Sequence, residues 1–351
     1  MDAHFTRRNL LGLAGITGLA TLVGCSGNQS AAPETPAAPG AGKNSSSEGR
    51  FPVTIKHALG TATIDKAPTK VVTLGQGAAE AAIALGVFPV GTETYAWGAD
   101  KDGHLPWVRE AFEKAGKALP RTFAGGEQLD VETIATLEPD LVLAPWSGLT
   151  QKQYDLLSEM CPVVAYEKTP WTTTWQQEIS TVATALGRPA DGQRVIAELD
   201  KTLADAAAEH PDWKGTTFSY IYTQGQGTLG IYLPTEQRVA MISSLGLTPD
   251  PATASIKAKD GSDWALIGLE NADKLDGSEL VFTWYMDAAT KKQVLSQPLY
   301  ASIPAIKRDT VVTSQDPQLV TAMSMINPLT VPWALPRITP LIDAAVKKLG
   351  K

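Results

Sequence analysis

The feature that most constrains the fold is an alternation of short β-branched runs with longer amphipathic runs. Between residues 70 and 166 the chain reads KVVTLG, GAAEAAIALG, VFPVGTETY, DVETIATLEP, DLVLAPW, TQKQYDLLSEM and PVVAY. Strands that alternate with helices at this spacing form a parallel sheet covered by helices. The sequence therefore predicts an α/β lobe over residues 51–188.

The second half of the chain repeats this alternation after a long helix. ADGQRVIAELDKTLADAAAEH predicts a helix over 189–210 that Pro211 ends. After it come TTFSYIYT, EQRVAMISSLG, IGLENADKL, SELVFTWYM, TVVTS and PLIDAAVKKLG, which predict a second α/β lobe with a parallel sheet over 211–351. Ligands of open α/β sheets bind beyond the carboxyl ends of the strands, so we expect a ligand cleft between two lobes joined by one helix.

The first 24 residues have the layout of a secretory signal peptide: a positive start, an apolar core too short to cross a bilayer, and a small-residue end. The segment around Arg7 and Arg8 resembles a twin-arginine export signal, and the residues up to Cys25 resemble the lipobox of bacterial lipoproteins. This resemblance implies that the signal is cut before Cys25 and that Cys25 receives a lipid. The alternative is a buried first helix with an incidental cysteine.

Residues 25–50 predict a flexible tether that follows the lipidated cysteine. Ser, Ala, Pro, Gly, Asn and Glu make up almost all of this stretch, a composition that cannot bury enough apolar surface to fold. We therefore expect an extracytoplasmic protein held at the outer face of the cell membrane by a lipid.

Composition limits the partners of the remaining chain. The net charge of the whole chain is -7 and no cluster of Lys and Arg occurs, which argues against nucleic acid. No later apolar run approaches the length of a membrane span. Once Cys25 is lipidated, Cys161 is the only other cysteine, so no intramolecular disulfide is possible. We expect Cys161 to be a small buried apolar residue rather than a reactive thiol.

Patterns that would indicate an enzyme are missing or lie in the wrong context. The chain has no G-x-S-x-G and no H-E-x-x-H, and its histidines are scattered, which disfavours direct binding of a metal. Residues 225–230 read G-x-G-x-x-G after a strand, but the following GIYLPTE is extended and carries a proline instead of opening a helix. We interpret the segment as a glycine turn between two strands that line the cleft, and a nucleotide-dependent enzyme remains the alternative.

The order of these pieces resembles the iron(III)-siderophore substrate-binding lipoproteins of ABC importers, in the helical-backbone class that also contains ferrichrome-, cobalamin- and haem-binding members. The motifs that carry the resemblance are APTKVVTLG, AAIALGVFPVGTE, the block from LDVETIATLEPDLVLAPW to TPWTTTW, and LENADKLDGSELVF. The resemblance covers residues 51–351. It implies a monomeric binding protein without enzymatic activity or a cofactor, in which a siderophore holds the iron.

The resemblance also implies two docking residues. In this family one surface glutamate on each lobe pairs with arginines of the membrane permease, and the matching positions are Glu132 and Glu270. Each is expected to be exposed near the start of a short helix, where an ion pair sets orientation more than affinity. The alternative is that both are ordinary solvated helix charges.

Aromatic residues at predicted strand ends are the candidate ligand contacts. Large rings can grip a bulky ferric siderophore, and a cation can pair with an anionic iron-bound oxygen. The candidates are Tyr95, Trp97, Trp146, Tyr166, Tyr222, Trp284 and Tyr285, with Arg238 as the cation. Each ring taken alone is more often part of the core than a contact. We assign Trp175 and Trp213 to the core.

Two questions stay open from the sequence. Haem or cobalamin is the alternative ligand, and Tyr222, Tyr285 and Met241 are possible axial ligands for haem. The class of siderophore is not determined either. Because a single rigid helix joins the lobes, we expect only a modest closure when the ligand binds.

Overall fold

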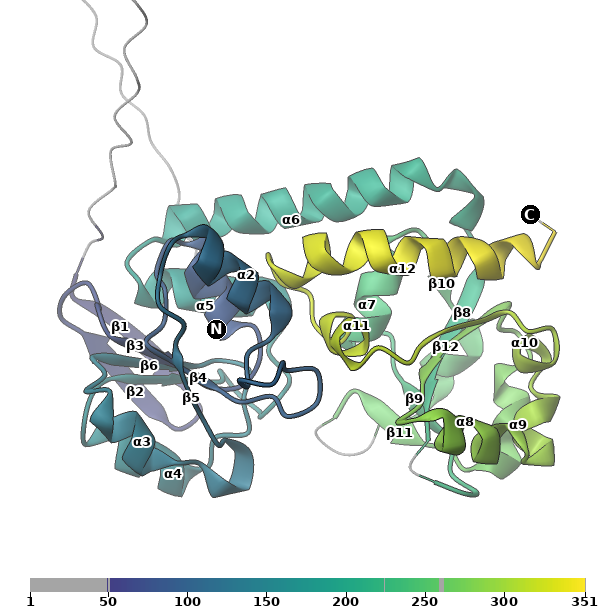
Figure 1. Ribbon diagram of the computed structural model, residues 1–351, viewed down its shortest axis with the longest axis horizontal. Helices are drawn as coiled ribbons and strands as arrows, with labels where there is room; N and C mark the ends of the chain where they lie inside the picture. The colour runs from purple at the N-terminus through teal and green to yellow at the C-terminus, as the bar shows by residue number, and fades with distance from the viewer. Residues whose placement is uncertain (1–48, 50, 224, 259–261, 351) are drawn as a thin grey trace, which may run out of the picture. The chain divides into compact units, whose positions relative to one another are not determined.

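The first lobe is built around a five-stranded sheet in which every strand is parallel to its neighbours (Figure 1). The computed structural model describes residue 49 and residues 51–223, 225–258 and 262–350. The strands lie in the order β5-β4-β3-β6-β7 and are β3 (Val71–Thr73), β4 (Gly91–Glu93), β5 (Arg121–Phe123), β6 (Leu141–Ala144) and β7 (Val163–Ala165). All residues of β3, β6 and β7 are buried, as expected for a parallel sheet covered on both faces.

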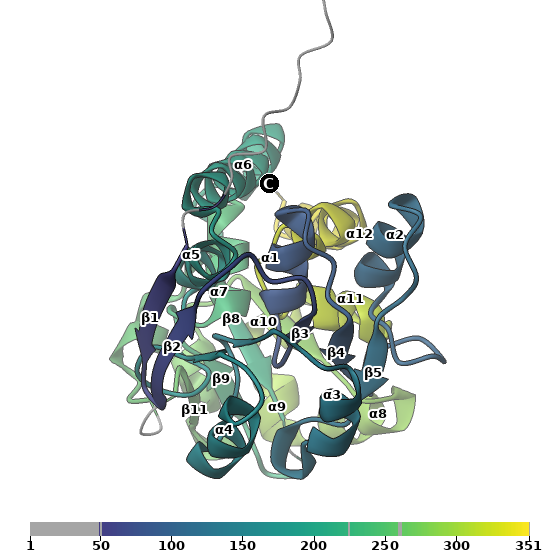
Figure 2. The same ribbon diagram turned by 90° about the vertical axis from the view of Figure 1, so that its left-hand side faces the viewer.

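Helices cover both faces of this sheet, as Figure 2 shows. One layer consists of α1 (Ala78–Ala84), α2 (Pro106–Lys114) and α5 (Trp175–Ala185), and the other of α3 (Val131–Thr136) and α4 (Gln151–Ser158), with a short 3-10 turn η1 (Gly126–Gln128) before α3. An antiparallel hairpin of β1 (Val53–His57) and β2 (Gly60–Ile64) packs beside α5 and β7. The predicted α/β lobe is therefore observed.

Successive residues of the central strands pack into different layers, because side chains alternate along a strand. Val71 and Leu141 join the cluster formed with α1, α2 and α5. Val72 and Val142, the next residues along, join the cluster that contains Ile134 of α3. This alternation fixes which side chains at the strand ends can face the second lobe.

Helix α6 (Pro189–Glu209) runs from the first lobe to the second along one side, as Figure 1 shows. It packs on α5 in the first lobe and on α7 and α12 in the second. The last helix, α12 (Thr330–Lys347), runs beside it although it contains Pro336 and Pro340. The single long helix predicted between the lobes is thus present.

The sheet of the second lobe is mixed, which corrects the prediction of a parallel sheet. Its strands are β8 (Thr217–Tyr222), β9 (Gly230–Tyr232), β10 (Thr248–Pro249), β11 (Trp264–Leu266), β12 (Leu280–Trp284) and β13 (Val311–Ser314). Strands β10, β12 and β13 follow the parallel pattern, but β9 is antiparallel to β8 and to β11. The connection from β8 to β9 is too short for a helical crossover, and antiparallel strands need only a tight turn.

Helices also cover both faces of the second sheet. They are α7 (Gln237–Ser244), α8 (Ala288–Leu295), α9 (Pro298–Ser302), α10 (Pro304–Lys307) and α11 (Pro317–Ala322), with 3-10 turns η2 (Pro211–Trp213), η3 (Pro251–Ser255) and η4 (Leu269–Leu275). Phe218 and Phe282 pack toward α7 and α12, whereas Ile221 and Val281 pack toward η4, α8, α9 and α10. The segment 288–307 breaks into three helices because a proline begins the second and the third.

One cluster of buried side chains continues through both lobes. It contains Val71 of the first sheet, Leu199 of α6, Phe218 of the second sheet and Ile338 of α12. The lobes therefore share a core in addition to the connecting helix. In the described part of the chain, no helix is both long enough and apolar enough to cross a membrane.

Candidate ligand-binding site

A cavity of about 500 Å³ lies between the two lobes. This volume falls within the range of about 300–1,000 Å³ that is usual for small-molecule sites. The first lobe contributes Trp146 and residues 170–176, α6 contributes Asp200, and the second lobe contributes Tyr232, residues 235–238, Ala240, Ser244 and residues 262–264. The cavity therefore lies beyond the carboxyl end of β6 in the first lobe, and in the second lobe beside the carboxyl end of β9 and the amino end of the antiparallel neighbour β11.

Two tryptophans form the first-lobe wall. Trp146 follows β6, and its ring meets that of Trp171 edge to face, with 4.8 Å between the centroids. Trp171 is 42% exposed, a high value for so large an apolar ring. Gly148 permits this arrangement, because a Cβ at that position would lie 2.7 Å from the ring of Trp171. An exposed pair of rings is therefore held in place on the cavity side.

The segment that carries Trp171 is fastened at its end. The hydroxyl of Thr173 donates a hydrogen bond of 2.6 Å to the carbonyl oxygen of Pro145. The hydroxyl of Thr174 caps α5 by accepting the backbone N–H of Gln177. These bonds connect residues 170–176 to the end of β6 and to α5, so the wall is preorganised.

The second-lobe wall is a layer of aromatic rings on the antiparallel hairpin. Tyr232, at the end of β9, lies 4.9 Å from Tyr222 of β8, and Tyr222 lies 6.1 Å from Trp264 of β11. Tyr232 and Trp264 line the cavity, and Tyr222, which does not line it, lies beside Tyr232 on the same face of the sheet. The reversal of β9 thus brings neighbouring rings together at one sheet edge.

An ion pair stands beside these rings. Glu236 precedes α7, and its carboxylate accepts the backbone N–H of Arg238 at 2.8 Å and a guanidinium N–H of the same residue. The guanidinium also lies over the ring of Tyr232, 4.5 Å from its centroid. Burial raises the pKa of Glu236, and Arg238 opposes that rise. Burial disfavours the charged form of Arg238, but Glu236 outweighs it and raises the arginine pKa. Arg238 is therefore charged and is bound to the carboxyl group of Glu236.

A family model described as "Periplasmic binding protein" matches residues 71–317, from the start of β3 to the start of α11. The chain belongs to this family. The match spans both lobes and α6, so it covers every element that lines the cavity.

Relatives of this periplasmic binding protein include two curated bacterial proteins. The chain is 27% identical over 264 residues to the "Probable siderophore-binding lipoprotein YfiY" of Bacillus subtilis. The aligned segment covers 72% of this chain and 77% of the relative. It is 25% identical over 266 residues to the "Fe(3+) dicitrate-binding periplasmic protein FecB" of Escherichia coli, covering 75% and 82% respectively.

Solved structures support the same fold. The crystal structure of Streptococcus pneumoniae PiaA in complex with ferrichrome is 28% identical, has a TM-score of 0.77, and covers 84% of this chain and 99% of that one. A periplasmic solute binding protein from Mycobacterium smegmatis is 25% identical with a TM-score of 0.71, covering 84% and 98%. Like these relatives, the chain is a binding protein rather than an enzyme.

The predicted ligand contacts of this periplasmic binding protein are only partly brought together. Trp146 and Arg238 line the cavity. Tyr222 does not line it, but its ring contacts that of Tyr232, which does. Tyr166 is buried in the first-lobe core, where its hydroxyl donates to the carbonyl oxygen of Leu149 at 3.1 Å. Tyr285 is buried in the second-lobe core. Tyr166 and Tyr285 are therefore core residues, because Tyr166 packs into the cluster that contains Ile134 of α3 and Tyr285 into the cluster that contains Tyr300 of α9.

Trp97 and Trp284 meet each other instead of lining the cavity. Their ring centroids lie 5.2 Å apart across the lobe interface. The hydroxyl of Thr321 on α11 also donates to the carbonyl oxygen of Trp97 at 3.1 Å. Tyr95 lines a separate hollow of about 20 Å³ inside the first lobe. The structure therefore places Trp97 and Trp284 in a contact that joins the lobes.

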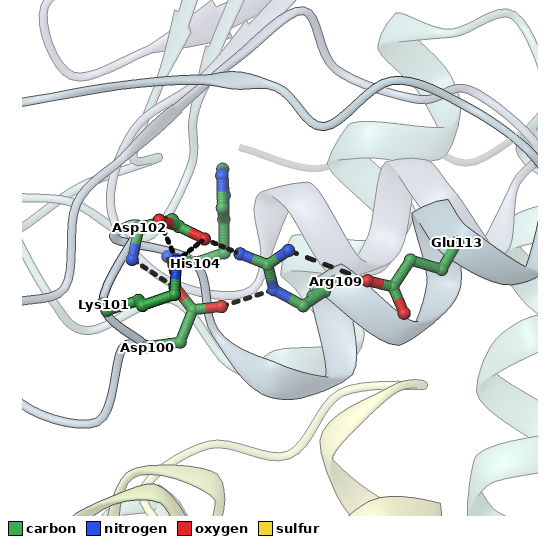
Figure 3. Close-up of polar contacts among 6 residues, drawn as sticks. All are labelled: Asp100, Lys101, Asp102, His104, Arg109 and Glu113. Carbon is green, nitrogen blue, oxygen red and sulfur yellow. Dashed lines mark hydrogen bonds and ion pairs between the residues drawn. The ribbon is translucent and has the colours of Figure 1, made fainter.

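A charged network holds the loop between β4 and α2, which carries Trp97 (Figure 3). The guanidinium of Arg109 donates to Asp100 at 2.5 Å and to Asp102 at 2.8 Å, and lies 3.7 Å from Glu113. Burial acts against ionisation of Asp100, but hydrogen bonds from Arg109 and the backbone outweigh it and lower the pKa to about 2. The loop is thereby fixed to α2, which positions Trp97 against the second lobe.

Several cavity residues were not found from the sequence. Trp171 lies in a loop before α5, where no periodicity marks it, and its backbone has a positive φ of 64°. Trp175 is buried, as predicted, but it also lines the cavity. Tyr232 and Trp264 lie on the two antiparallel strands. The GIYLPTE segment already indicated an extended strand beside the cleft, and its tyrosine was the available signal.

The glycine pattern forms the turn between β8 and β9. Gly225 and Gly227 have φ values of 127° and 76°, which favour glycine, and Gly230 begins β9. No helix follows Gly230, so the segment lacks the helix N-terminus that would hold a pyrophosphate. The interpretation as a turn between two strands is confirmed.

The remaining predicted positions fall into two groups. Glu132 and Glu270 are exposed in the first turns of α3 and η4. Arg7, Arg8, Cys25 and most of the tether lie outside the described residues.

Cys161 is buried, as predicted, and burial raises the pKa of its thiol to about 11. The thiol is therefore almost wholly protonated at neutral pH and unreactive. Within the described ranges, no group of three His, Cys, Asp or Glu side chains could hold a metal ion.

Proposed function

We propose that this periplasmic binding protein captures an iron(III)–siderophore complex in the inter-lobe cavity and delivers it to the permease of an ABC importer. The observation that carries the proposal is the cavity of about 500 Å³ between the lobes, walled by rings of Trp146, Trp171, Tyr232 and Trp264. Relatives with names or titles that mention siderophores, ferric citrate or ferrichrome share the fold. A bulky chelate with an apolar rim is the ligand that such walls grip best.

The structure gives less support to haem as a ligand than the sequence did, because the sequence offered Tyr222, Tyr285 and Met241 as axial ligands. Met241 and Tyr285 are buried in the core, and Tyr222 is also buried and does not line the cavity. An axial ligand has to reach the iron from the surface of the cavity. The three side chains that supported haem therefore lack the required position.

The binding step is tested by titrating intrinsic tryptophan fluorescence of the full chain in detergent, since four tryptophans of the described chain line the cavity: Trp146, Trp171, Trp175 and Trp264. The titrants are iron-loaded siderophores, their iron-free forms, haem and cobalamin. We expect saturating quenching by a ferric siderophore and a weaker response to its iron-free form. A flat response to every siderophore together with saturation by haem or cobalamin contradicts the proposal.

Export and anchoring complete the proposed function. The signal layout of residues 1–24 supports export, and Cys25 supports attachment to a lipid. The tether over 25–50 gives the binding unit a reach of several nanometres from the membrane surface. A lipid anchor of this kind keeps the loaded protein close to the permease without a membrane-spanning helix.

Glu132 and Glu270 are the proposed docking residues for the permease. Both are exposed, and they project from the first turns of α3 and η4, one on each lobe. Neither contributes to the cavity. We expect Glu132→Ala with Glu270→Ala to abolish uptake of ferric siderophore by whole cells while the affinity for the ligand stays within about twofold, because rim charges set orientation.

A matched pair of exposed glutamates provides the control for this experiment. Glu159 follows α4 and Glu209 ends α6, and both are exposed. Changing both to alanine removes the same charge from the surface. Normal transport by the Glu132/Glu270 variant, or equal loss in the control, would contradict the docking assignment.

A further inference from the structure

The charges that line the cavity carry information about its ligand. Among the described residues that line it, the charged side chains are Asp200, Glu236, Arg238 and Asp263. Three are carboxylates and one is a cation. The wall therefore presents more negative than positive charge to anything that enters.

The one cation on this described surface is already engaged. Arg238 pairs with Glu236, lies over the ring of Tyr232, and is only 22% exposed at its side chain. Glu236 and Arg238 together contribute no net charge. An anionic ligand would have to compete with a carboxylate that is bound to the same guanidinium in a partly buried setting, where charge pairs are costly to separate.

Asp200 and Asp263 then determine the sign of the net charge on the described cavity wall. Asp200 is exposed on α6, and Asp263 lies on the second-lobe wall at the start of β11. Burial raises the pKa of Asp263, and the charge of Arg238, which is shared with Glu236, opposes that rise. A ligand of net negative charge meets these two carboxylates, and among the described lining residues the one cation, Arg238, is bound to Glu236. The repulsion from Asp263 is the stronger of the two, because Asp263 is less exposed than Asp200 and water screens its charge less.

Ferric chelates differ in charge according to their donor groups. Iron(III) carries three positive charges, so three hydroxamates give a neutral centre, three catecholates give a strongly negative one, and citrate complexes are negative as well. We propose that the cavity takes a ferric complex without net negative charge, that is, a hydroxamate-type chelate, neutral or bearing a free ammonium group. This inference rests on the proposed function and narrows it to one class of siderophore.

A series of ligands with one iron centre and different charge tests the inference. The series consists of a linear ferric trishydroxamate with a free terminal amine, its N-acetylated form and its N-succinylated form, which carry one positive, zero and one negative charge. Tryptophan fluorescence of the full chain in detergent gives the affinities. We expect the amine form to bind about tenfold or more tightly than the succinylated form, the scale of one or two charge contacts in a partly buried site.

A double variant and a control variant test whether the cavity carboxylates cause the selectivity. Asp200→Asn with Asp263→Asn removes both charges with little change in volume, and we expect it to reduce the preference for the amine form severalfold. Asp205→Asn is the control, because Asp205 lies on α6 outside the cavity and pairs with Lys201 at 2.5 Å. The control should leave the preference unchanged.

The outcomes separate this inference from the function on which it rests. Binding of the succinylated trishydroxamate, a ferric tris-catecholate or ferric dicitrate as tightly as the amine form overturns the charge preference and leaves siderophore binding in place. Binding of none of the ferric complexes overturns the proposed function and this inference together. Equal selectivity in the double variant and in the native chain also overturns the inference, because the two carboxylates would then play no part.

Discussion

Aromatic side chains stand at the lobe interface in two regions, and the two regions use them differently. Around the cavity, rings meet partners of their own lobe: Trp146 meets Trp171, and Tyr232 meets Tyr222. On the side of α2, α11 and α12, rings meet partners of the other lobe. There Trp97 meets Trp284 at 5.2 Å, and Trp107 meets Trp333 at 5.4 Å.

The first group of rings is placed to contact a ligand, and the second group holds the two lobes together. A ring that is held by its own lobe keeps one face open toward the cavity, so a ligand can cover it. A ring that packs against the opposite lobe contributes to holding the lobes together. Trp107 and Trp333 are buried by this contact, and Trp97 and Trp284 are partly buried. Trp107 and Trp333 are further fixed by hydrogen bonds to Glu80 at 2.7 Å and Glu110 at 3.2 Å. Aromatic content alone therefore does not locate a ligand site.

The largest expected effect comes from breaking a contact across the lobes. Trp333 is 9% exposed, and Trp333→Ala should lower the free energy of unfolding by about 3–5 kcal/mol, the usual cost of deleting a buried large aromatic ring. Denaturant unfolding followed by circular dichroism measures it. A loss below about 1 kcal/mol would mean that the contact between Trp107 and Trp333 contributes little cohesion.

The next effect concerns a ring that faces the cavity. Trp171→Ala should weaken binding of a ferric siderophore by about tenfold to a hundredfold, since an interface aromatic that is covered on binding contributes on this scale. The exposed ring stabilises the unliganded fold little, so unfolding should change by less than about 1 kcal/mol. Leu299→Ala, at a 51% exposed position on α9, is the control for both measurements. Unchanged affinity would remove Trp171 from the binding site.

Per pH unit, the smallest effect is a pH dependence of the unfolding free energy. It comes from a buried carboxyl group close to the contact between Trp107 and Trp333. Glu178 of α5 is buried beside Glu80, and burial first and the charge of Glu80 second raise its pKa well above the usual value. The folded state therefore holds a proton that the unfolded chain releases. Stability from this group is fully present below about pH 4.5 and falls as pH rises toward the folded pKa, by at most about 1.4 kcal/mol per pH unit.

The variant Glu178→Gln tests this dependence because it keeps the shape and removes the proton equilibrium. We expect a flatter profile of unfolding free energy between pH 5 and 8 than in the native chain. Glu209→Gln, at the exposed end of α6, should leave the profile as it is. Parallel profiles for Glu178→Gln and the native chain would show that the carboxyl ionises freely in the fold.

The sequence predicted the architecture well because the relevant signals are long and periodic. The helix predicted over 189–210 is observed as α6 over Pro189–Glu209, and the alternation before it gave four of the five strands of the first sheet, β3, β4, β6 and β7, but not the edge strand β5. The mixed second sheet was missed. Strand direction depends on where a short turn sends the chain, and β-branched runs look alike in either direction.

The site was predicted less well because a predicted strand end shows where a residue lies along the chain but not in which direction its side chain points. Trp284 and Tyr285 are adjacent, yet Trp284 faces the other lobe and Tyr285 enters the core. Side chains alternate with a period of two, so an uncertainty of one residue exchanges a contact for a core position. Trp171 was missed for a different reason: it belongs to a loop, where no periodicity exists to read.

The buried cluster that runs through both lobes has a consequence for the rate of uptake. Opening the lobes widely would expose this shared core to water, so we expect the empty and the loaded protein to keep nearly the same outer surface. With docking through Glu132 and Glu270, as proposed, the empty protein competes with the loaded one for the same permease. Import then follows the fraction of binding protein that carries cargo, and cells that produce the protein in excess of the available siderophore slow their own iron supply.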